Sequence, residues 1–276
     1  MKPGDMAPQL PAGASVIEAR ALRGGTVAPT HECVPQEIAV ALEYNGVSHV
    51  VMLATPADLE DFALGFSLTE GLIDAPEDLL EFDSSARDNG IVLSLRITAR
   101  CEARLKDRRR NLAGRTGCGL CGTDSLDQVL RVPARALPPT RVSAAALQRS
   151  VRELGQRQPL QQATGATHAA AWCALDGSVR LVREDVGRHN ALDKLIGAMA
   201  RATIDTAQGL VAITSRASVE MVQKTALAGV AVLAAVSAPT LLAVQSARRS
   251  GLMLAGFVRD DRATIYCGAE RLLDGD

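Results

Sequence analysis

Aromatic residues are scarce in this sequence, at 3% of 276 positions, although apolar residues together make up 47%. A sizeable core must therefore be built from aliphatic side chains, mainly alanine, valine, leucine and isoleucine. The formal net charge is −1, so the chain lacks the basic excess that gives a protein a general attraction to nucleic acid. We expect no nucleic-acid partner and interpret the basic run over 104–110 as a local feature.

No basic start followed by an apolar run opens the chain, and we expect a soluble, cytoplasmic protein. Residues 225–247 carry no charge and are long enough to span a membrane. Their alanine-rich composition and the break at Ser237-Ala238-Pro239 favour a buried strand followed by a helix, so we expect no membrane partner. Six cysteines in a chain of this length do not resemble a disulfide scaffold.

The first half of the chain predicts a small α+β domain over 31–141. Alternating apolar and polar residues over 37–54 predict a hairpin with Asn45-Gly46 at a type I′ turn. Thr55 and Pro56 then predict the start of a helix that ends near Gly71. A further strand is expected over 91–97, followed by a basic loop and a cysteine-containing loop. We expect the preceding residues, 1–30, to form a disordered tail.

Strands and helices alternate in the second half of the chain. Helices are expected over 143–156, 217–228 and 239–250. One more helix is expected to begin in the charged loop 183–194. The expected strands are one through Trp172 and Cys173, then 179–182, 209–214, 230–236, 252–258 and 263–267. This pattern predicts an α/β domain over 142–276, with a largely parallel sheet covered by helices on both faces. Ligands usually bind at the carboxyl ends of such strands. The residues expected at these ends, on one rim of the sheet, are Thr214-Ser215-Arg216, Ser237 and 257–262.

The segment Gly117-Cys118-Gly119-Leu120-Cys121-Gly122 carries two thiols three positions apart among glycines. Glycine permits positive φ, so this composition is typical of a mobile, exposed loop. Nearby positive charge favours the reactive thiolate. Basic residues lie just upstream, at Arg104, Lys106, Arg108, Arg109, Arg110 and Arg115. We interpret the pair as a centre of reactive sulfur chemistry, while half of a zinc site and an incidental pair remain open.

A zinc site would need more ligands than Cys118 and Cys121, because structural zinc takes four and catalytic zinc three from the protein. Cys101 and His189 complete such a set only if the fold brings them together. Zinc deaminases pair P-C-x-x-C with H-x-E. Here no histidine has glutamate two positions on, which excludes that class. A thioredoxin-like pair is disfavoured because the CxxC lies in a glycine-rich frame before the α/β half.

Charged residues over 184–190 group two carboxylates, a cation and an imidazole. They suit a general acid/base set or a ligand-shaping element, and equally a helix N-terminus with capping acids. His168 is expected in the core or behind a site. Arg259 and Arg262 suit phosphate contacts or an ordinary polar turn, and Thr214-Ser215-Arg216 suits an anion at a helix N-terminus.

Several motifs together resemble the FdhD family of formate dehydrogenase accessory sulfur carriers. They are Gly117–Gly122, Thr164-Gly165-Ala166-Thr167-His168-Ala169-Ala170-Ala171, Glu184-Asp185-Val186-Gly187-Arg188-His189-Asn190-Ala191-Leu192-Asp193-Lys194 and Thr214-Ser215-Arg216. The resemblance runs from about residue 30 to the end. It implies a cytidine-deaminase-like fold in the C-terminal part, without the deaminase zinc or any other permanent metal, and a homodimer.

The resemblance also implies a sulfurtransferase that takes sulfane sulfur from a cysteine desulfurase. The sulfur passes to the bis-molybdopterin guanine dinucleotide cofactor of formate dehydrogenase, which is bound as a substrate through its guanine nucleotide. Cys118 matches the persulfide-bearing cysteine and Cys121 the second thiol. The cofactor-binding segment matches Phe257, Val258, Arg259, Asp260, Asp261 and Arg262. Two alternatives stay open: a non-enzymatic cofactor-binding chaperone with a structural zinc on the CxxC, and a nucleotide-binding regulatory module.

Overall fold

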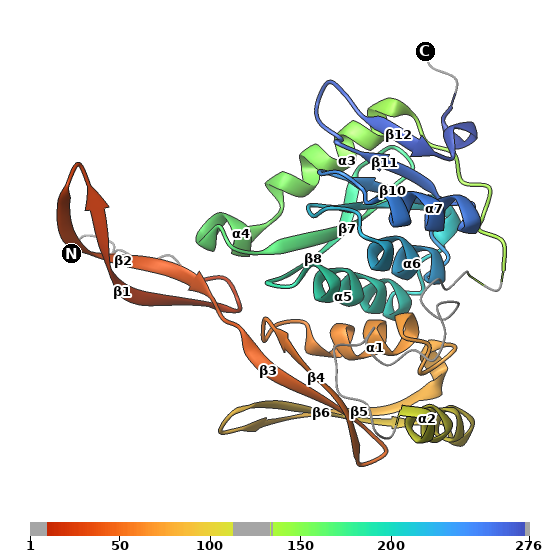
Figure 1. Ribbon diagram of the computed structural model, residues 1–276, viewed down its shortest axis with the longest axis horizontal. Helices are drawn as coiled ribbons and strands as arrows, with labels where there is room; N and C mark the ends of the chain where they lie inside the picture. The colour runs from red at the N-terminus through yellow and green to blue at the C-terminus, as the bar shows by residue number, and fades with distance from the viewer. Residues whose placement is uncertain (1–9, 113–132, 134, 274–276) are drawn as a thin grey trace, which may run out of the picture.

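The computed structural model describes residues 10–112, 133 and 135–273, so Cys118 and Cys121 lie outside the described residues. The described chain forms three β-sheets with helices between and outside them (Figure 1). The strands are β1 Ala14–Arg23, β2 Thr26–Pro35, β3 Ile38–Tyr44, β4 Val47–Ala54, β5 Leu79–Arg87, β6 Gly90–Ile97, β7 His168–Ala174, β8 Val179–Asp185, β9 Gly209–Ile213, β10 Val232–Ala235, β11 Met253–Gly256 and β12 Thr264–Cys267. The helices are α1 Leu59–Thr69, α2 Ala99–Leu112, α3 Ala144–Gln156, α4 Pro159–Thr164, α5 Arg188–Arg201, α6 Val219–Leu227 and α7 Leu241–Ser250.

Strands β1 and β2 form an antiparallel hairpin that extends away from the rest of the molecule (Figure 1). The prediction of a disordered tail over 1–30 is therefore wrong for residues 14–30. Gly24 and Gly25 both adopt positive φ, which closes the tight turn between the strands. Helix α4 contacts the hairpin, but much of the hairpin's apolar surface stays open, and Leu22 is 70% exposed. The sequence signal was weak because the apolar residues here do not mark a buried face.

The second sheet has the order β4-β3-β6-β5, and helix α1 covers one face of it (Figure 1). The hairpin predicted over 37–54 is confirmed, with φ of 49° at Asn45 and 77° at Gly46. The helix expected after Thr55 begins later than predicted, because Asp58 at φ 54° is the N-cap. Residues 99–112 form helix α2, where we expected a basic loop.

The third sheet has the order β12-β11-β10-β9-β7-β8. Strands β9, β10 and β11 are parallel, whereas β7, β8 and β12 run antiparallel to their neighbours. The predicted α/β class is confirmed, but the sheet is mixed rather than largely parallel. The reason is connection length: the Asp176-Gly177 turn and the short segment 257–263 join antiparallel neighbours, because a parallel crossover needs a dozen or more residues.

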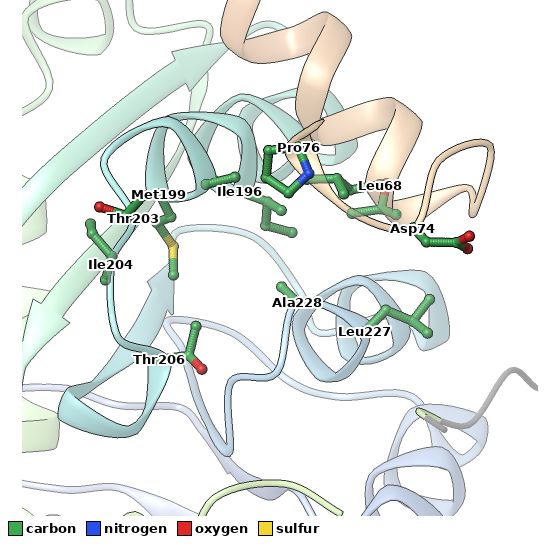
Figure 2. Close-up of a pocket in the computed structure, with 12 residues that line it drawn as sticks. Leu68, Asp74, Pro76, Ile196, Met199, Thr203, Ile204, Thr206, Leu227 and Ala228 are labelled. Atoms are coloured by element: carbon green, nitrogen blue, oxygen red, sulfur yellow. The ribbon is translucent and has the colours of Figure 1, made fainter. Parts of the chain in front are cut away.

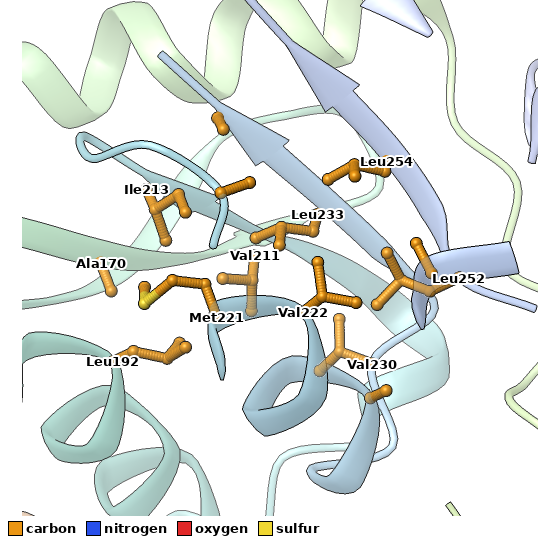
Figure 3. Packing of buried hydrophobic residues seen from close by; sticks show 14 of the residues in the cluster. Ala170, Leu192, Val211, Ile213, Met221, Val222, Val230, Leu233, Leu252 and Leu254 are labelled. Atoms are coloured by element: carbon orange, nitrogen blue, oxygen red, sulfur yellow. The ribbon is translucent and has the colours of Figure 1, made fainter. Parts of the chain in front are cut away.

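Helices cover both faces of this six-stranded sheet, as predicted. On one face, Leu192 of α5 and Met221 of α6 pack on Val211 and Leu233 of the sheet (Figure 3). On the other face α3 packs through buried aliphatic side chains. Residues 225–247 contain the end of α6, β10 and the start of α7, so the predicted strand and helix are confirmed. In the part of the chain that the structure describes, no helix is long and apolar enough to cross a membrane.

Helices α1 and α5 lie against each other between the two larger sheets (Figure 1). Two glycines let their backbones touch. A Cβ built on Gly65 would lie 1.8 Å from the carbonyl oxygen of Asp193, and one on Gly197 would lie 1.9 Å from that of Asp61. We call this contact the α1–α5 seam. The division into domains at 141 and 142 stays a prediction.

Candidate functional site

The charged segment 184–194 mainly joins the four-stranded sheet to the six-stranded sheet. Asp185 and Lys194 are both fully buried, and Lys194 Nζ lies 2.7 Å from Asp185 Oδ2. Lys194 also donates to the carbonyl oxygen of Thr55 at 2.9 Å, and the Thr55 N–H donates to Asp185 Oδ2 at 3.0 Å. Asn190 donates to the carbonyl oxygen of Leu53. These contacts fasten the end of β4 to α5, so Asp185 is committed to structure and not to proton transfer.

Glu184 also has a structural role, at a helix that the sequence analysis missed. Its carboxylate accepts from the N–H groups of Leu160 at 2.9 Å and Gln161 at 2.8 Å, the first turn of α4. Of the interpretations left open, capping acids fit best, although the capped helix is α4 and not α5.

A second buried cluster joins α1, α5 and α6. Lys224 Nζ donates to Asp193 Oδ1 and Oδ2 at 2.9 and 3.0 Å, to Glu70 at 2.9 Å and to Thr69 at 2.8 Å. Burial lowers the pKa of Lys224, but the carboxylates of Asp193 and Glu70 outweigh it, and the pKa lies above its ordinary value. The ammonium therefore stays charged and holds the seam from the α6 side.

The carboxyl ends of β9, β10 and β11 lie along one edge of the six-stranded sheet. Val236 N–H donates to the carbonyl oxygen of Ile213 at 3.0 Å, and Val258 N–H donates to that of Ala235 at 3.1 Å. The residues that follow these strands therefore lie on one rim, as predicted. They are Thr214-Ser215-Arg216, Ser237 and the segment Phe257–Arg262. We call this rim the carboxyl edge.

The segment 257–262 forms a tight turn at this edge. Phe257 has φ 50° and is 42% exposed, although positive φ is unusual for a bulky residue. Arg259 donates through Nη1 to the carbonyl oxygen of Val236 at 2.6 Å, and its N–H donates to that of Arg262 at 2.8 Å. The Arg259 side chain thus braces the turn with one end of its guanidinium. The Arg262 side chain is exposed.

Two histidines and an arginine lie at the same edge. His168 begins β7, and the Ala169 N–H beside it donates to Thr214 Oγ1 at 3.0 Å. His168 is half-buried and not a core residue. Burial lowers the pKa of His168 and of His189, and the positive charge of Arg188 lowers each pKa further. This part of the edge therefore places the Arg188 guanidinium beside two imidazoles that favour the neutral form at pH 7.

The four described cysteines are free thiols. Two of them are buried, where they are poorly placed for nucleophilic attack, and the other two are only partly accessible to solvent. Cys101 and Cys173 are fully buried, and burial raises the pKa of Cys173 to about 12. Burial also raises the pKa of Cys267, and Cys33 is half-buried. The predicted sulfur residues, Cys118 and Cys121, fall outside the described residues. The role of that pair stays a prediction.

Parts of the basic run upstream of the CxxC are already paired in α2. Arg104 lies 2.9 Å from an oxygen of Asp74, and Lys106 lies 2.5 Å from Glu102. These two cations are therefore partly neutralised, and they support a thiolate less than the sequence suggested.

One group of side chains in the described part of the chain has metal-ligand spacing. It consists of Asp74, Asp78 and Cys101, whose ligand atoms lie within 4.8 Å of one another. Arg100 donates to both oxygens of Asp78, and Arg104 approaches Cys101 Sγ at 3.5 Å. Two guanidinium groups thus supply the positive charge that a cation would bring. His189 is not part of this group, and a zinc set that joins Cys101 and His189 to Cys118 and Cys121 stays untested, because that pair lies outside the described residues.

A cavity of about 420 Å³ lies among α1, α5 and α6 (Figure 2). Its lining is mostly aliphatic, and the Asp74 carboxylate at its rim is paired with Arg104. No nucleophile or acid/base pair among the described residues converges on it. The lining residues are Leu68, Thr69, Asp74, Pro76, Ile196, Met199, Ala200, Thr203, Ile204, Thr206, Leu227 and Ala228. The carboxyl edge is therefore the better candidate site.

A polar pocket at that edge was missed because α4 was missed. The pocket lies beside His168 and Thr214, both of which were considered, and is completed by Gln158 and Gln161. The signals for α4 were present in the sequence: proline at the first helical position, and Gly165 at φ 70° as the C-cap. The helix spans only Pro159–Thr164, too short to give a clear apolar period.

Comparison with known proteins is consistent with this arrangement. The FdhD/NarQ family model matches residues 35–273. The sulfur carrier protein FdhD of Cupriavidus necator is 55% identical over 250 residues, which cover 91% of this chain and 87% of that protein. The sulfur carrier protein FdhD of Variovorax paradoxus is 51% identical, over 96% and 95% of the two chains.

A solved structure has the same fold. It is described as a formate dehydrogenase accessory protein from Desulfotalea psychrophila and superposes with a TM-score of 0.73 at 23% identity, covering 94% of this chain and 99% of that one. The match to the family model over residues 35–273 and the identity to curated relatives along nearly the whole chain lead to one conclusion: this chain belongs to the FdhD/NarQ family.

Proposed function

We propose that this chain is a cytoplasmic sulfur carrier with sulfurtransferase activity that serves formate dehydrogenase. It accepts sulfane sulfur from a cysteine desulfurase as a persulfide on Cys118. It delivers the sulfur to bis-molybdopterin guanine dinucleotide, which it binds as a substrate. The observation that carries the proposal is the 55% identity, over 91% of the chain, to a protein named as a sulfur carrier.

Three of the four described cysteines, Cys101, Cys173 and Cys267, are poorly suited to carry sulfur, which supports a carrier role for Cys118. Buried thiols such as Cys101 and Cys173 cannot reach the active site of another protein. Only a thiolate attacks sulfur efficiently, and burial holds the pKa of Cys173 and Cys267 above the ordinary value. Cys118 and Cys121 are flanked by glycines, a composition suited to reaching a partner.

The transfer steps balance without a metal. The Cys118 thiolate attacks the outer sulfur of the desulfurase persulfide, and the desulfurase thiolate leaves. The Cys121 thiolate then attacks the inner sulfur of the Cys118 persulfide and expels hydrosulfide toward the cofactor. The resulting Cys118–Cys121 disulfide is reduced by a cellular dithiol, which returns both thiols to the starting state.

The guanine nucleotide end of the cofactor binds, in this proposal, at the carboxyl edge. The segment 257–262 is exposed there, and ligands of sheets with parallel strands usually bind at this edge. Arg262 is free to turn toward a phosphate, while Arg259 supports the turn from beneath. The mixed sheet with helices on both faces agrees with a cytidine-deaminase-like arrangement, which we propose for the C-terminal part.

We also propose a homodimer that pairs through the β1–β2 hairpin. A two-stranded hairpin is marginally stable alone, and this one carries exposed apolar side chains. They are Val16, Ile17, Leu22 and Val27. The double substitution Leu22→Asp/Val27→Asp should yield a monomer in light scattering, whereas Leu175→Asp, on a turn of the six-stranded sheet, should leave a dimer.

The decisive experiment is the intact mass of the protein after incubation with a cysteine desulfurase and cysteine, with and without reductant. The wild type should gain one sulfur that reductant removes, Cys118→Ala should gain none, and the matched control Cys33→Ala should behave as wild type. A wild type that gains no sulfur and carries zinc instead would support the chaperone with a structural zinc. A Cys118→Ala variant that still activates formate dehydrogenase fully would refute the assignment of Cys118.

A further inference from the structure

The cavity among α1, α5 and α6 has the size and the lining of a small-molecule site. Its volume of about 420 Å³ lies within the range of about 300–1,000 Å³ that is typical of ligand pockets. Eight of its twelve lining residues are apolar, and three are threonines. Figure 2 shows Pro76, Ile196 and Met199 on one side of the cavity and Thr206 and Ala228 on the other. The body of a ligand here must therefore be mainly aliphatic.

This cavity is separate from the carboxyl edge. Thr206 lies shortly before β9 and Ala228 shortly before β10, so the cavity is at the amino ends of these strands. No residue lines both this cavity and the polar pocket beside His168. A ligand in the cavity is therefore not the cofactor that we place at the carboxyl edge.

Three helices present their C-terminal ends to the cavity. Thr69 is the last residue of α1, Leu227 is the last residue of α6, and Ala200 is the last but one of α5. All three line the cavity. The C-terminal end of a helix carries a partial negative charge, which attracts a cation and repels an anion. The helix ends therefore favour a positively charged group.

The cations near the cavity are already paired with carboxylates. Each of them lies within 3.3 Å of at least one carboxylate oxygen, so none is left to attract an anionic ligand. The pairs are Arg100 and Arg104 with Asp74 and Asp78, Lys224 with Glu70 and Asp193, and Arg201 with Glu60 and Asp61.

Two more carboxylates adjoin the lining without such a partner. Glu77 follows the lining residue Pro76, and Asp205 precedes the lining residue Thr206. Both side chains are exposed, and the described part of the chain gives neither of them a cation. The charge around the cavity is therefore negative in sum, as at the helix ends.

Thr203, which lines the cavity, has a strained backbone. Its φ is 49°, an unusual value for a residue branched at Cβ. It follows Ala202, the C-cap of α5, at a position where helices usually have glycine or asparagine. Residues held in such conformations cluster at ligand sites. Thr203 is thus a second observation, independent of charge, that indicates a binding site.

We propose that this cavity binds a small organic cation, an aliphatic body that carries one ammonium group. The body packs among α1, α5 and α6, and the ammonium group faces the helix ends and the carboxylates of Glu77 and Asp205. Because the ligand contacts three helices of the folded chain, it stabilises the α1–α5 seam and its packing on α6. The site adds a second binding function and does not depend on the sulfur-carrier proposal.

The test is calorimetric titration of the full chain at pH 7 with n-hexylammonium, 1-hexanol and hexanoate, which share one aliphatic body. Hexylammonium should bind and raise the melting temperature. Hexanol should bind at least about fivefold more weakly and hexanoate more weakly still, because only the ammonium ion complements the negative field. Added salt should weaken the binding of hexylammonium. No binding of hexylammonium, or binding of hexanol or hexanoate as tight as that of hexylammonium, would overturn the proposal.

A cavity-filling substitution locates the ligand. Ala228→Phe should weaken the binding of hexylammonium by about tenfold or more, because the ring occupies the space of the aliphatic body. The matched control is Ala202→Phe, at an exposed position of the same wall that does not line the cavity, and it should bind as wild type. Circular dichroism checks that both variants fold. Wild-type affinity in folded Ala228→Phe would refute the site.

A charge-neutralising variant tests the ammonium group without altering the packing. Glu77→Gln/Asp205→Asn should weaken the binding of hexylammonium by about threefold or more and leave that of hexanol unchanged. Asparagine can still cap the short helix η3 Thr206–Gln208, as Asp205 does. The matched control Glu18→Gln, on the β1–β2 hairpin, should bind both ligands as wild type. Hexylammonium affinity unchanged in the double variant would refute the assigned charge.

Thr203→Gly separates binding from stability. It should raise the melting temperature of the free protein, since glycine adopts positive φ without strain. It should also weaken the binding of hexylammonium by about threefold, because a wall contact is lost and the chain is freer at this position. A raised melting temperature with unchanged affinity would refute the role of Thr203 in the site.

Discussion

The backbone contact between α1 and α5 predicts an unusual response to alanine. Gly65 and Gly197 lie in the middle of α1 and α5, where alanine is normally preferred over glycine by about 1 kcal/mol. A Cβ at either position, however, would meet a backbone carbonyl oxygen of the other helix at 1.8 or 1.9 Å. Backbone cannot rotate away as a side chain can, so the two helices must separate.

We expect Gly65→Ala and Gly197→Ala each to destabilise the protein despite the better helix former. Overpacking costs about 1–3 kcal/mol and sometimes more. Contact with backbone belongs at the upper end, which leaves a net loss of about 2 kcal/mol after the gain in helix propensity. For a chain of this size that loss corresponds to a fall of about 4–8 °C in melting temperature.

Gly155 is the matched control. It lies in α3, and a Cβ there meets no atom within 4 Å. Gly155→Ala should raise the melting temperature by up to about 4 °C, since only the propensity term acts. Melting followed by far-ultraviolet circular dichroism and by fluorescence of the single tryptophan, Trp172, measures all three variants. An unchanged or raised melting temperature in Gly65→Ala would show that the α1–α5 seam is not a backbone contact.

Three further predictions concern charge and thiols. Lys224→Met should cost about 3–5 kcal/mol of unfolding free energy, because the buried Asp193 carboxylate loses its counter-charge. Adding Asp193→Leu should restore part of the lost unfolding free energy, and urea titrations measure both variants. Burial raises the pKa of Asp78, but hydrogen bonds from backbone and side-chain donors outweigh it and lower the pKa. Its stabilisation is therefore present above about pH 4 and lost below, so Asp78→Asn should cost about 1–3 kcal/mol at pH 7 and less in acid. A thiol reagent should label Cys33 in the native protein, but Cys173, with a pKa of about 12, only after unfolding.

Most of the six-stranded sheet could be predicted from the sequence, because its strands and helices have strong, separate signals. Ser143 before α3 and Thr240 before α7 accept N-cap hydrogen bonds, and the buried strands are short aliphatic runs. Strand direction was harder, since the β7–β8 and β11–β12 pairs are antiparallel through short turns whose lengths alone carry the information. The β1–β2 hairpin was missed because its apolar residues are exposed and show no buried face.

The parts of the site whose position depends on strand order could be predicted from the sequence. The parts whose position depends on contacts between distant segments were missed. The residues after β9, β10 and β11 share an edge by topology alone, so the rim could be foreseen. Nothing in the sequence indicated that Glu184 would cap α4 or that Gln158 would be buried without a partner. Both depend on a six-residue helix whose position is set by contacts distant in sequence.

The motif over 184–194 shows why a specific sequence pattern need not be a catalytic one. Helix α5 begins with Arg188 and His189 at the carboxyl edge. In the next turns it places Asp193 beside Lys224 of α6, and Lys194 beside Thr55, the residue that follows β4. Arg188 at the carboxyl edge and the buried charges between the sheets therefore belong to one helix, α5. A movement of α5 against α1 would also move Arg188. The charged residues of this segment therefore serve positioning: Asp185, Asp193 and Lys194 are buried with their partners, and these contacts fix where α5 begins at the carboxyl edge.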